Sequence, residues 1–194
     1  SLRKHPRFVD MDKCIACGLC AEKCPKKVAN EYDGALSQRK AIYVKYAQAV
    51  PLKYAIDADH CIFLTKGKCG NCKKVCPTGA INYDEKPQDV TLQVGAVILS
   101  SGCDPYDPKG HDNFGYEKSK DIVTSLEFER ILSSSGPYGG HLVRPSDKRE
   151  PRKIAWLQCI GSRDVHIGAR GYCSSVCCTY AIKEAMLAKE HCKD

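Results

Sequence analysis

Residues 14–25 read Cys-Ile-Ala-Cys-Gly-Leu-Cys-Ala-Glu-Lys-Cys-Pro, a run in which four cysteines are spaced C-x2-C-x2-C-x3-C and are followed directly by proline. A second run begins at Cys61, is spaced C-x7-C-x2-C-x3-C and also ends on proline. The cysteines of the two runs are Cys14, Cys17, Cys20 and Cys24, and then Cys61, Cys69, Cys72 and Cys76. Structural cysteines have no reason to repeat at matching offsets, so the doubled pattern predicts two metal-binding loops.

The first run has the spacing of the cluster-binding loop in bacterial ferredoxins that carry two 4Fe–4S clusters. Three thiolates separated by two residues each can wrap one face of a cubane from a single loop, whose backbone N–H groups then offset the negative charge of the cluster. The fourth cysteine of such a run ligates the other cluster in two-cluster ferredoxins. We therefore expect two crossed ligand sets, Cys14, Cys17, Cys20 and Cys76 for one cluster and Cys61, Cys69, Cys72 and Cys24 for the other.

Zinc, disulfides and buried structural thiols are the alternatives for these cysteines. Structural zinc sites also use C-x2-C pairs, but usually as two separated pairs rather than as triplets. A disulfide framework suits a secreted chain. With no leader pattern visible ahead of Ser1, we expect a reducing, cytoplasmic compartment, in which fourteen cysteines indicate metal binding.

The composition is that of a soluble chain of one or two domains. It has 194 residues, 43% of them hydrophobic, and no stretch approaches the roughly 20 apolar residues of a membrane-spanning helix. The formal net charge is +7, but lysines and arginines are scattered among acidic residues, and four phenylalanines and one tryptophan offer little base stacking. We expect neither membrane insertion nor nucleic-acid binding.

The segment up to residue 86 is too short to bury a large core, so we expect metal binding to supply its folding free energy. Within this segment, the apolar and aromatic run Ile42–Tyr46 predicts a short hairpin laid against the clusters. The character of the sequence changes at residue 90, where the nearly continuous apolar run Val90–Leu99 predicts a buried strand.

The last third of the chain predicts two helices and one more strand. Thr124 and Glu127 have the spacing of a capping box, which predicts the start of a helix over Ser125–Ser134. The apolar run Ile154–Ile160 predicts a strand, and a helix is expected over Ser174–Glu190. A strand, a loop and a helix in this order form half of a βαβ nucleotide-binding unit.

Together with the cysteine runs, three further stretches resemble the heterodisulfide reductase A-type family, which comprises iron–sulfur flavoprotein subunits of methanogens and some anaerobic bacteria. They are VGAVILSSG (94–102), QCIGSRD (158–164) and YCSSVCC (172–178). The resemblance covers essentially the whole chain and implies an α+β internal piece of a thioredoxin-reductase-like flavoprotein. Its parts are then a two-cluster ferredoxin-like module (1–86), a return segment of the flavin domain (87–150) and the start of a degenerate nucleotide-binding domain (151–194).

A flavin site is only partly represented in this sequence. The G-x-G-x-x-G fingerprint that would hold the FAD pyrophosphate is missing. Thr91 and the strand end at Leu99–Gly102 resemble the segment that closes over FAD in such reductases, so Gly102 and Cys103 are candidate FAD contacts. Cys103 has a second interpretation, as a small buried apolar residue.

Cys173 and Cys177 stand close to where such a reductase has its nicotinamide-nucleotide site. Gly161 is followed by Ser-Arg-Asp rather than by further glycines, so we do not expect NAD to bind. The two cysteines are one helical turn apart at a predicted helix N-terminus, which lowers thiol pKa values. The resemblance implies that they contribute to a further cluster; reduced, packed cysteines are the alternative, and Cys159 and Cys192 suit structural roles.

Our leading hypothesis is a segment of a heterodisulfide reductase A-type protein that relays single electrons between two 4Fe–4S clusters and FAD in an anaerobic, bifurcating complex. The resemblance implies other subunits of that complex as partners, with an electron-donating subunit or a ferredoxin. It also implies that this segment alone is not catalytically competent. A freestanding two-cluster electron carrier and a zinc-stabilised interaction module are the competing hypotheses.

Overall fold

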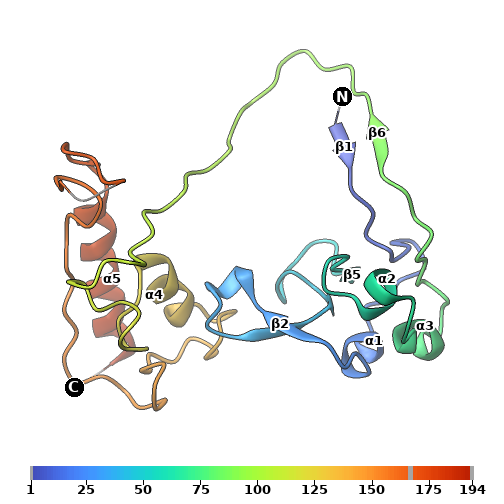
Figure 1. The fold of residues 1–194 in the computed structure, drawn as a ribbon, viewed down its shortest axis with the longest axis horizontal. Helices are drawn as coiled ribbons and strands as arrows, with labels where there is room; N and C mark the ends of the chain where they lie inside the picture. The colour runs from blue at the N-terminus through green and yellow to red at the C-terminus, as the bar shows by residue number, and fades with distance from the viewer. Residues whose placement is uncertain (1, 166–167, 193–194) are drawn as a thin grey trace. The chain divides into compact units, whose positions relative to one another are not determined.

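The structure is a computed structural model that describes residues 2–165 and 168–192, and the chain divides into two compact units, Ser1–Leu99 and Ser100–Asp194 (Figure 1). Helices and strands are both present, as the α+β prediction requires. Among the described residues, no helix has the length and apolar character needed to cross a lipid bilayer.

The first unit contains three antiparallel pairs of very short strands. The pairs are β1 (Leu2–Lys4) with β6 (Gln88–Val90), β2 (Lys27–Ala29) with β3 (Gln38–Lys40), and β4 (Ile42–Tyr43) with β5 (Ala55–Ile56). The third pair confirms the hairpin predicted at Ile42, in a shorter form. The β1–β6 pair joins the two ends of this unit, since Leu2 lies opposite Val90. A 3-10 turn, η1 (Glu31–Asp33), connects β2 to β3.

Three short helices lie within the two cysteine runs. They are α1 (Leu19–Glu22), α2 (Ile62–Lys66) and α3 (Asn71–Val75). α1 and α3 start in the same way, because Gly18 and Gly70 both precede them with positive φ angles of 86° and 93°. Glycine adopts this left-handed conformation without the steric cost of a Cβ, so the sequence Cys-Gly-x-Cys forms the same turn in both runs.

The core of the first unit is built from apolar side chains and cysteines together. Its buried members are Phe8, Val9, Cys14, Cys20, Ile42, Ile56, Cys61, Ala80 and Ile81. Backbone hydrogen bonds tie distant segments around this core, from Ile56 N–H to the Arg7 carbonyl (2.9 Å) and from Asn82 N–H to the Phe8 carbonyl (3.0 Å). Because three of the nine buried residues are cysteines, the metal-binding loops are part of the core.

The strand predicted over Val90–Leu99 is not formed. β6 ends at Val90, the residues after it have no regular secondary structure, and Val97, Ile98 and Leu99 are 74%, 90% and 89% exposed. The strand predicted over Ile154–Ile160 is also absent. A strand needs a neighbour to accept and donate its backbone hydrogen bonds, and no described residues pair with either run.

The second unit is organised around two helices, α4 (Ser125–Leu132) and α5 (Cys177–His191). The predicted capping box is confirmed, because Glu127 N–H donates to Thr124 Oγ1 (3.3 Å) and Thr124 N–H donates to Glu127 Oε2 (2.6 Å). α5 begins three residues later than the sequence predicts. The two helices pack together, and the rings of Phe128 and Trp156 form a T-shaped pair with a centroid distance of 5.8 Å.

Candidate metal centres

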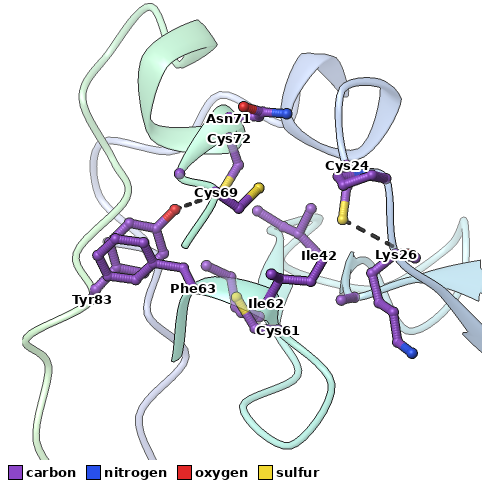
Figure 2. A pocket seen from close by; sticks show the side chains of 14 residues that line it. Cys24, Lys26, Ile42, Cys61, Ile62, Phe63, Cys69, Asn71, Cys72 and Tyr83 are labelled. Carbon is purple, nitrogen blue, oxygen red and sulfur yellow. Dashed lines mark hydrogen bonds between the residues drawn. The ribbon is translucent and has the colours of Figure 1, made fainter. Parts of the chain in front are cut away.

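Two cysteine-lined cavities lie in the first unit. The four thiols of one cavity are those of Cys24, Cys61, Cys69 and Cys72. Figure 2 shows these side chains around the cavity, with Ile42 and Phe63 completing its wall. The four thiols of the other cavity are those of Cys14, Cys17, Cys20 and Cys76. We call them the Cys72 cavity and the Cys76 cavity.

Each cavity takes three cysteines from one run and one from the other. Cys24 lies apart from the other cysteines of its run because the chain after it enters the β2–β3 pair. There, Ala41 N–H donates to the Lys26 carbonyl (3.1 Å), and Lys40 Nζ donates to the Cys24 carbonyl (2.6 Å). Cys76 ends α3 in an extended conformation. The chain beyond it pairs back at the bridge between Val9 and Ile81. The eight sequence-predicted cysteines are thus brought together in two groups of four.

The thiols differ in how readily they ionise. Burial raises the pKa of the Cys20 thiol to about 12, and burial also raises the pKa of the Cys72 thiol. Burial acts in the same direction on Cys76, but the Thr78 hydroxyl and the Ala80 N–H, 3.7 and 3.3 Å from its sulfur, lower its pKa overall. Metal binding must therefore displace protons from the buried thiols, which couples the loading of the cavities to folding.

The thiols in each cavity limit which metal ion or cluster the cavity can bind. Four thiols with mostly apolar surroundings suit zinc or an iron–sulfur cluster, because thiolates are soft ligands. Over residues 2–165 and 168–192, no three His, Cys, Asp or Glu side chains converge closely enough to hold a single metal ion. Four cysteines in each wall are also the ligand number of a 4Fe–4S cubane.

Two tyrosines that the sequence did not single out lie beside the cavities. The Tyr83 hydroxyl is 2.9 Å from Cys72 Sγ, and its ring stacks on Phe63 with a centroid distance of 3.9 Å and an interplanar angle of 21° (Figure 2). Tyr54 lines the Cys76 cavity. No spacing rule links either tyrosine to a cysteine, so nothing in the pattern predicted these contacts.

A further group of thiols lies in the second unit, at the start of α5. Cys177 is buried and Cys173 and Cys178 are exposed. The Ser174 hydroxyl, the Cys159 backbone and the Cys178 thiol hydrogen bond to Cys177 and lower its pKa, although burial opposes them. Cys159 and Cys178 therefore belong to the same group of thiols as Cys173 and Cys177, although the sequence-based prediction named only Cys173 and Cys177 as metal ligands. Whether these thiols bind metal stays a prediction.

The predicted flavin contacts Gly102 and Cys103 and the degenerate nucleotide loop at Gly161 all lie in the second unit. Gly102 and Cys103 are exposed in a segment without secondary structure, so their contact with FAD stays a prediction. The sequence predicted that Gly161 lies in a degenerate nucleotide-binding loop. In the structure, the Tyr106 side chain packs directly against Gly161. A Cβ added at Gly161 would lie 2.2 Å from the Cγ of that ring.

The comparisons with known proteins agree with the two-cavity geometry. Residues 13–80 match the family described as 4Fe-4S dicluster domain, which supports two 4Fe–4S clusters. The chain is 47% identical over 191 residues to the iron-sulfur A subunit of the CoB–CoM heterodisulfide reductase of Methanocaldococcus jannaschii. It is 48% identical over 189 residues to the second of two such iron-sulfur A subunits in Methanopyrus kandleri.

A third relative is the A subunit of the H(2):CoB-CoM heterodisulfide,ferredoxin reductase of Methanothermobacter marburgensis, which is 40% identical over 193 residues. The alignments with these three proteins cover 98%, 97% and 100% of the chain. The chain spans only 28% of the length of each relative, so it corresponds to one segment of those proteins.

Proposed function

Because the chain belongs to the heterodisulfide reductase A-type family, we propose that it relays single electrons through two 4Fe–4S clusters within a longer iron–sulfur flavoprotein. The observation that carries the proposal is the pair of cavities, each lined by four cysteines drawn from both runs. When bound, each cluster supplies a one-electron couple. The cavities would hold the clusters in mostly apolar surroundings, with the exposed Cys17 and Cys69 on their solvent side.

The proposed ligands follow the cavity walls. They are Cys24, Cys61, Cys69 and Cys72 for one cluster and Cys14, Cys17, Cys20 and Cys76 for the other. Gly18 and Gly70 allow the backbone to turn closely beside the two clusters. The apolar side chains in the two walls, among them Ile42 and Ile81, shield the clusters from solvent.

In the longer protein, we further propose that the second unit belongs to a thioredoxin-reductase-like domain that binds FAD. The apolar segments 91–99 and 154–160 would then find strand partners in sequence outside this chain, and Gly102 and Cys103 would lie near the flavin. Cys173 and Cys177, with Cys159 and Cys178 beside them, are the candidate ligands of an additional cluster. The proposed partners are other subunits of a cytoplasmic heterodisulfide reductase-type complex and an electron-donating subunit or ferredoxin.

Anaerobic reconstitution followed by iron, sulfide and zinc analysis tests the central proposal. Two cubanes require about eight iron and about eight sulfide per chain. Stoichiometric zinc with little iron would instead show that the cavities stabilise a structural module. Flavin titration tests the second part: tight FAD binding is expected once the flanking sequence is present, and its failure there would remove the flavoprotein from the proposal.

A further inference from the structure

The contact between Tyr83 and Cys72 has a consequence for the cluster in the Cys72 cavity. Between a free thiol and a hydroxyl, either group can donate the hydrogen bond. A cysteine that ligates a metal is deprotonated, so its sulfur can only accept. At 2.9 Å, the Tyr83 hydroxyl is therefore the donor whenever Cys72 serves as a ligand.

The position of this hydroxyl is restrained by the two residues before Tyr83 and by a contact of its ring. Ile81 is bridged to Val9, and Asn82 N–H donates to the Phe8 carbonyl, so the backbone that carries Tyr83 is tied to the core. The stacked ring of Phe63 covers one face of the tyrosine ring. All these contacts lie within the first unit, so they depend on nothing outside it.

In the Cys76 cavity, the Ala80 N–H (3.3 Å) and the Thr78 hydroxyl (3.7 Å) contact Cys76 Sγ, but no tyrosine among the described residues takes the place of Tyr83. Tyr54 is half-buried in the wall of that cavity, yet across residues 2–165 and 168–192 its hydroxyl makes no hydrogen bond to a cysteine sulfur. Its hydroxyl instead faces the turn at Gly18, 3.5 Å from where a Cβ on that glycine would lie. Tyr54 and Tyr83 thus form a matched pair, in which only Tyr83 contacts a sulfur.

We propose that Tyr83 is a positioning residue that raises the reduction potential of the cluster in the Cys72 cavity by donating a hydrogen bond to Cys72 Sγ. This inference rests on the proposed function, because it requires a cluster in that cavity. Reduction adds negative charge to the cluster and its sulfurs, so a fixed donor stabilises the reduced state more than the oxidised state. The hydrogen bond therefore favours the electron on this cluster.

The test is an anaerobic redox titration, followed by EPR, of the reconstituted chain and its Tyr83→Phe variant. The phenylalanine keeps the stack on Phe63 and removes the donor. We expect one of the two midpoint potentials to fall, by up to the equivalent of a tenfold change in the equilibrium, which is about 59 mV for one electron. Cys61→Ser changes a proposed ligand of the cluster in the Cys72 cavity, so it should shift the same midpoint potential and thereby assign that potential to this cluster. The matched control, Tyr54→Phe, should leave it in place.

A second substitution keeps the test decisive if Tyr83→Phe fails to assemble its cluster. Replacing Tyr83 by 3-fluorotyrosine retains the ring and makes the hydroxyl a stronger donor, so the same midpoint should rise. Iron analysis of the parent chain tests the proposed function separately from the role of Tyr83. Absence of clusters in the parent chain would overturn the proposed function itself. With both clusters present, unchanged potentials or an equal shift of both would overturn the role of Tyr83.

Discussion

Removing Cys76 should damage the cluster held by the cysteines of the first run. Cys76 lines the cavity of Cys14, Cys17 and Cys20, so Cys76→Ala leaves that cavity with three thiols and the Cys72 cavity with all four. Starting from about eight iron per chain, the variant should keep one intact cubane of about four iron. The damaged site should hold fewer iron atoms than the intact one. EPR and Mössbauer spectra count intact cubanes directly.

Double substitutions show which cysteines share a cluster. Cys14→Ala added to Cys76→Ala removes two ligands from one cavity, so one intact cubane should remain. Cys61→Ala added to Cys76→Ala removes one ligand from each cavity, so no intact cubane should remain. Substitutions in separate sites add their effects, whereas those that share a site do not.

The opposite pattern would refute the crossed assignment. If Cys76 belonged with the other cysteines of its own run, the pair Cys61→Ala and Cys76→Ala would leave one intact cubane and the pair Cys14→Ala and Cys76→Ala would leave none. Cys103→Ala is the control, because Cys103 is exposed and lies in neither cavity. It should leave both cubanes intact.

The second unit offers three predictions that do not depend on metal. Thr124→Ala removes a capping-box hydrogen bond and should lower the unfolding free energy by about 1 kcal/mol in denaturant titrations. Hydrogen bonds from Ser146 hold the pKa of Asp121 below its ordinary value of 3.8, so Ser146→Ala should raise that pKa in an NMR titration. The stability that this contact contributes is present above the unfolded-state pKa of Asp121 and is lost as pH falls through its folded-state pKa. Trp156→Phe removes the donor to Glu184 Oε2. Glu184 is 1% exposed, and its Oε1 has no hydrogen-bond partner among the described residues, so a loss of roughly 1–3 kcal/mol in unfolding free energy is expected. An unchanged denaturation midpoint in either stability variant, or an unchanged Asp121 pKa, would contradict the corresponding prediction.

Local features of the sequence predicted the structure well. The capping box at Thr124 needs only residues three apart, and it formed as the pattern predicts. The hairpin at Ile42 formed as well, although its two strands are only two residues long. α5 began later than predicted, and helix ends are the least certain part of any sequence-based assignment.

The strands predicted from the apolar runs Val90–Leu99 and Ile154–Ile160 were both wrong for the described residues. An apolar run such as 91–99 has the composition of a buried strand, but composition does not supply a neighbouring strand. Tyr83 was missed for a related reason, since its contact with Cys72 joins residues that no local pattern connects.

The sequence by itself determined the chemistry of the candidate metal centres. Residues that wrap one face of a cluster must lie in one short loop, so their spacing is written into a few consecutive positions. The ferredoxin spacing also predicted that Cys24 and Cys76 cross between the loops, but only the tertiary structure supplies the contacts that bring the loops together. It brings Cys24 into the wall of one cavity and Cys76 into the wall of the other, and it sets the Tyr83 hydroxyl against Cys72. Those contacts depend on hairpins and bridges between distant segments, and their geometry follows from the packing of the whole unit.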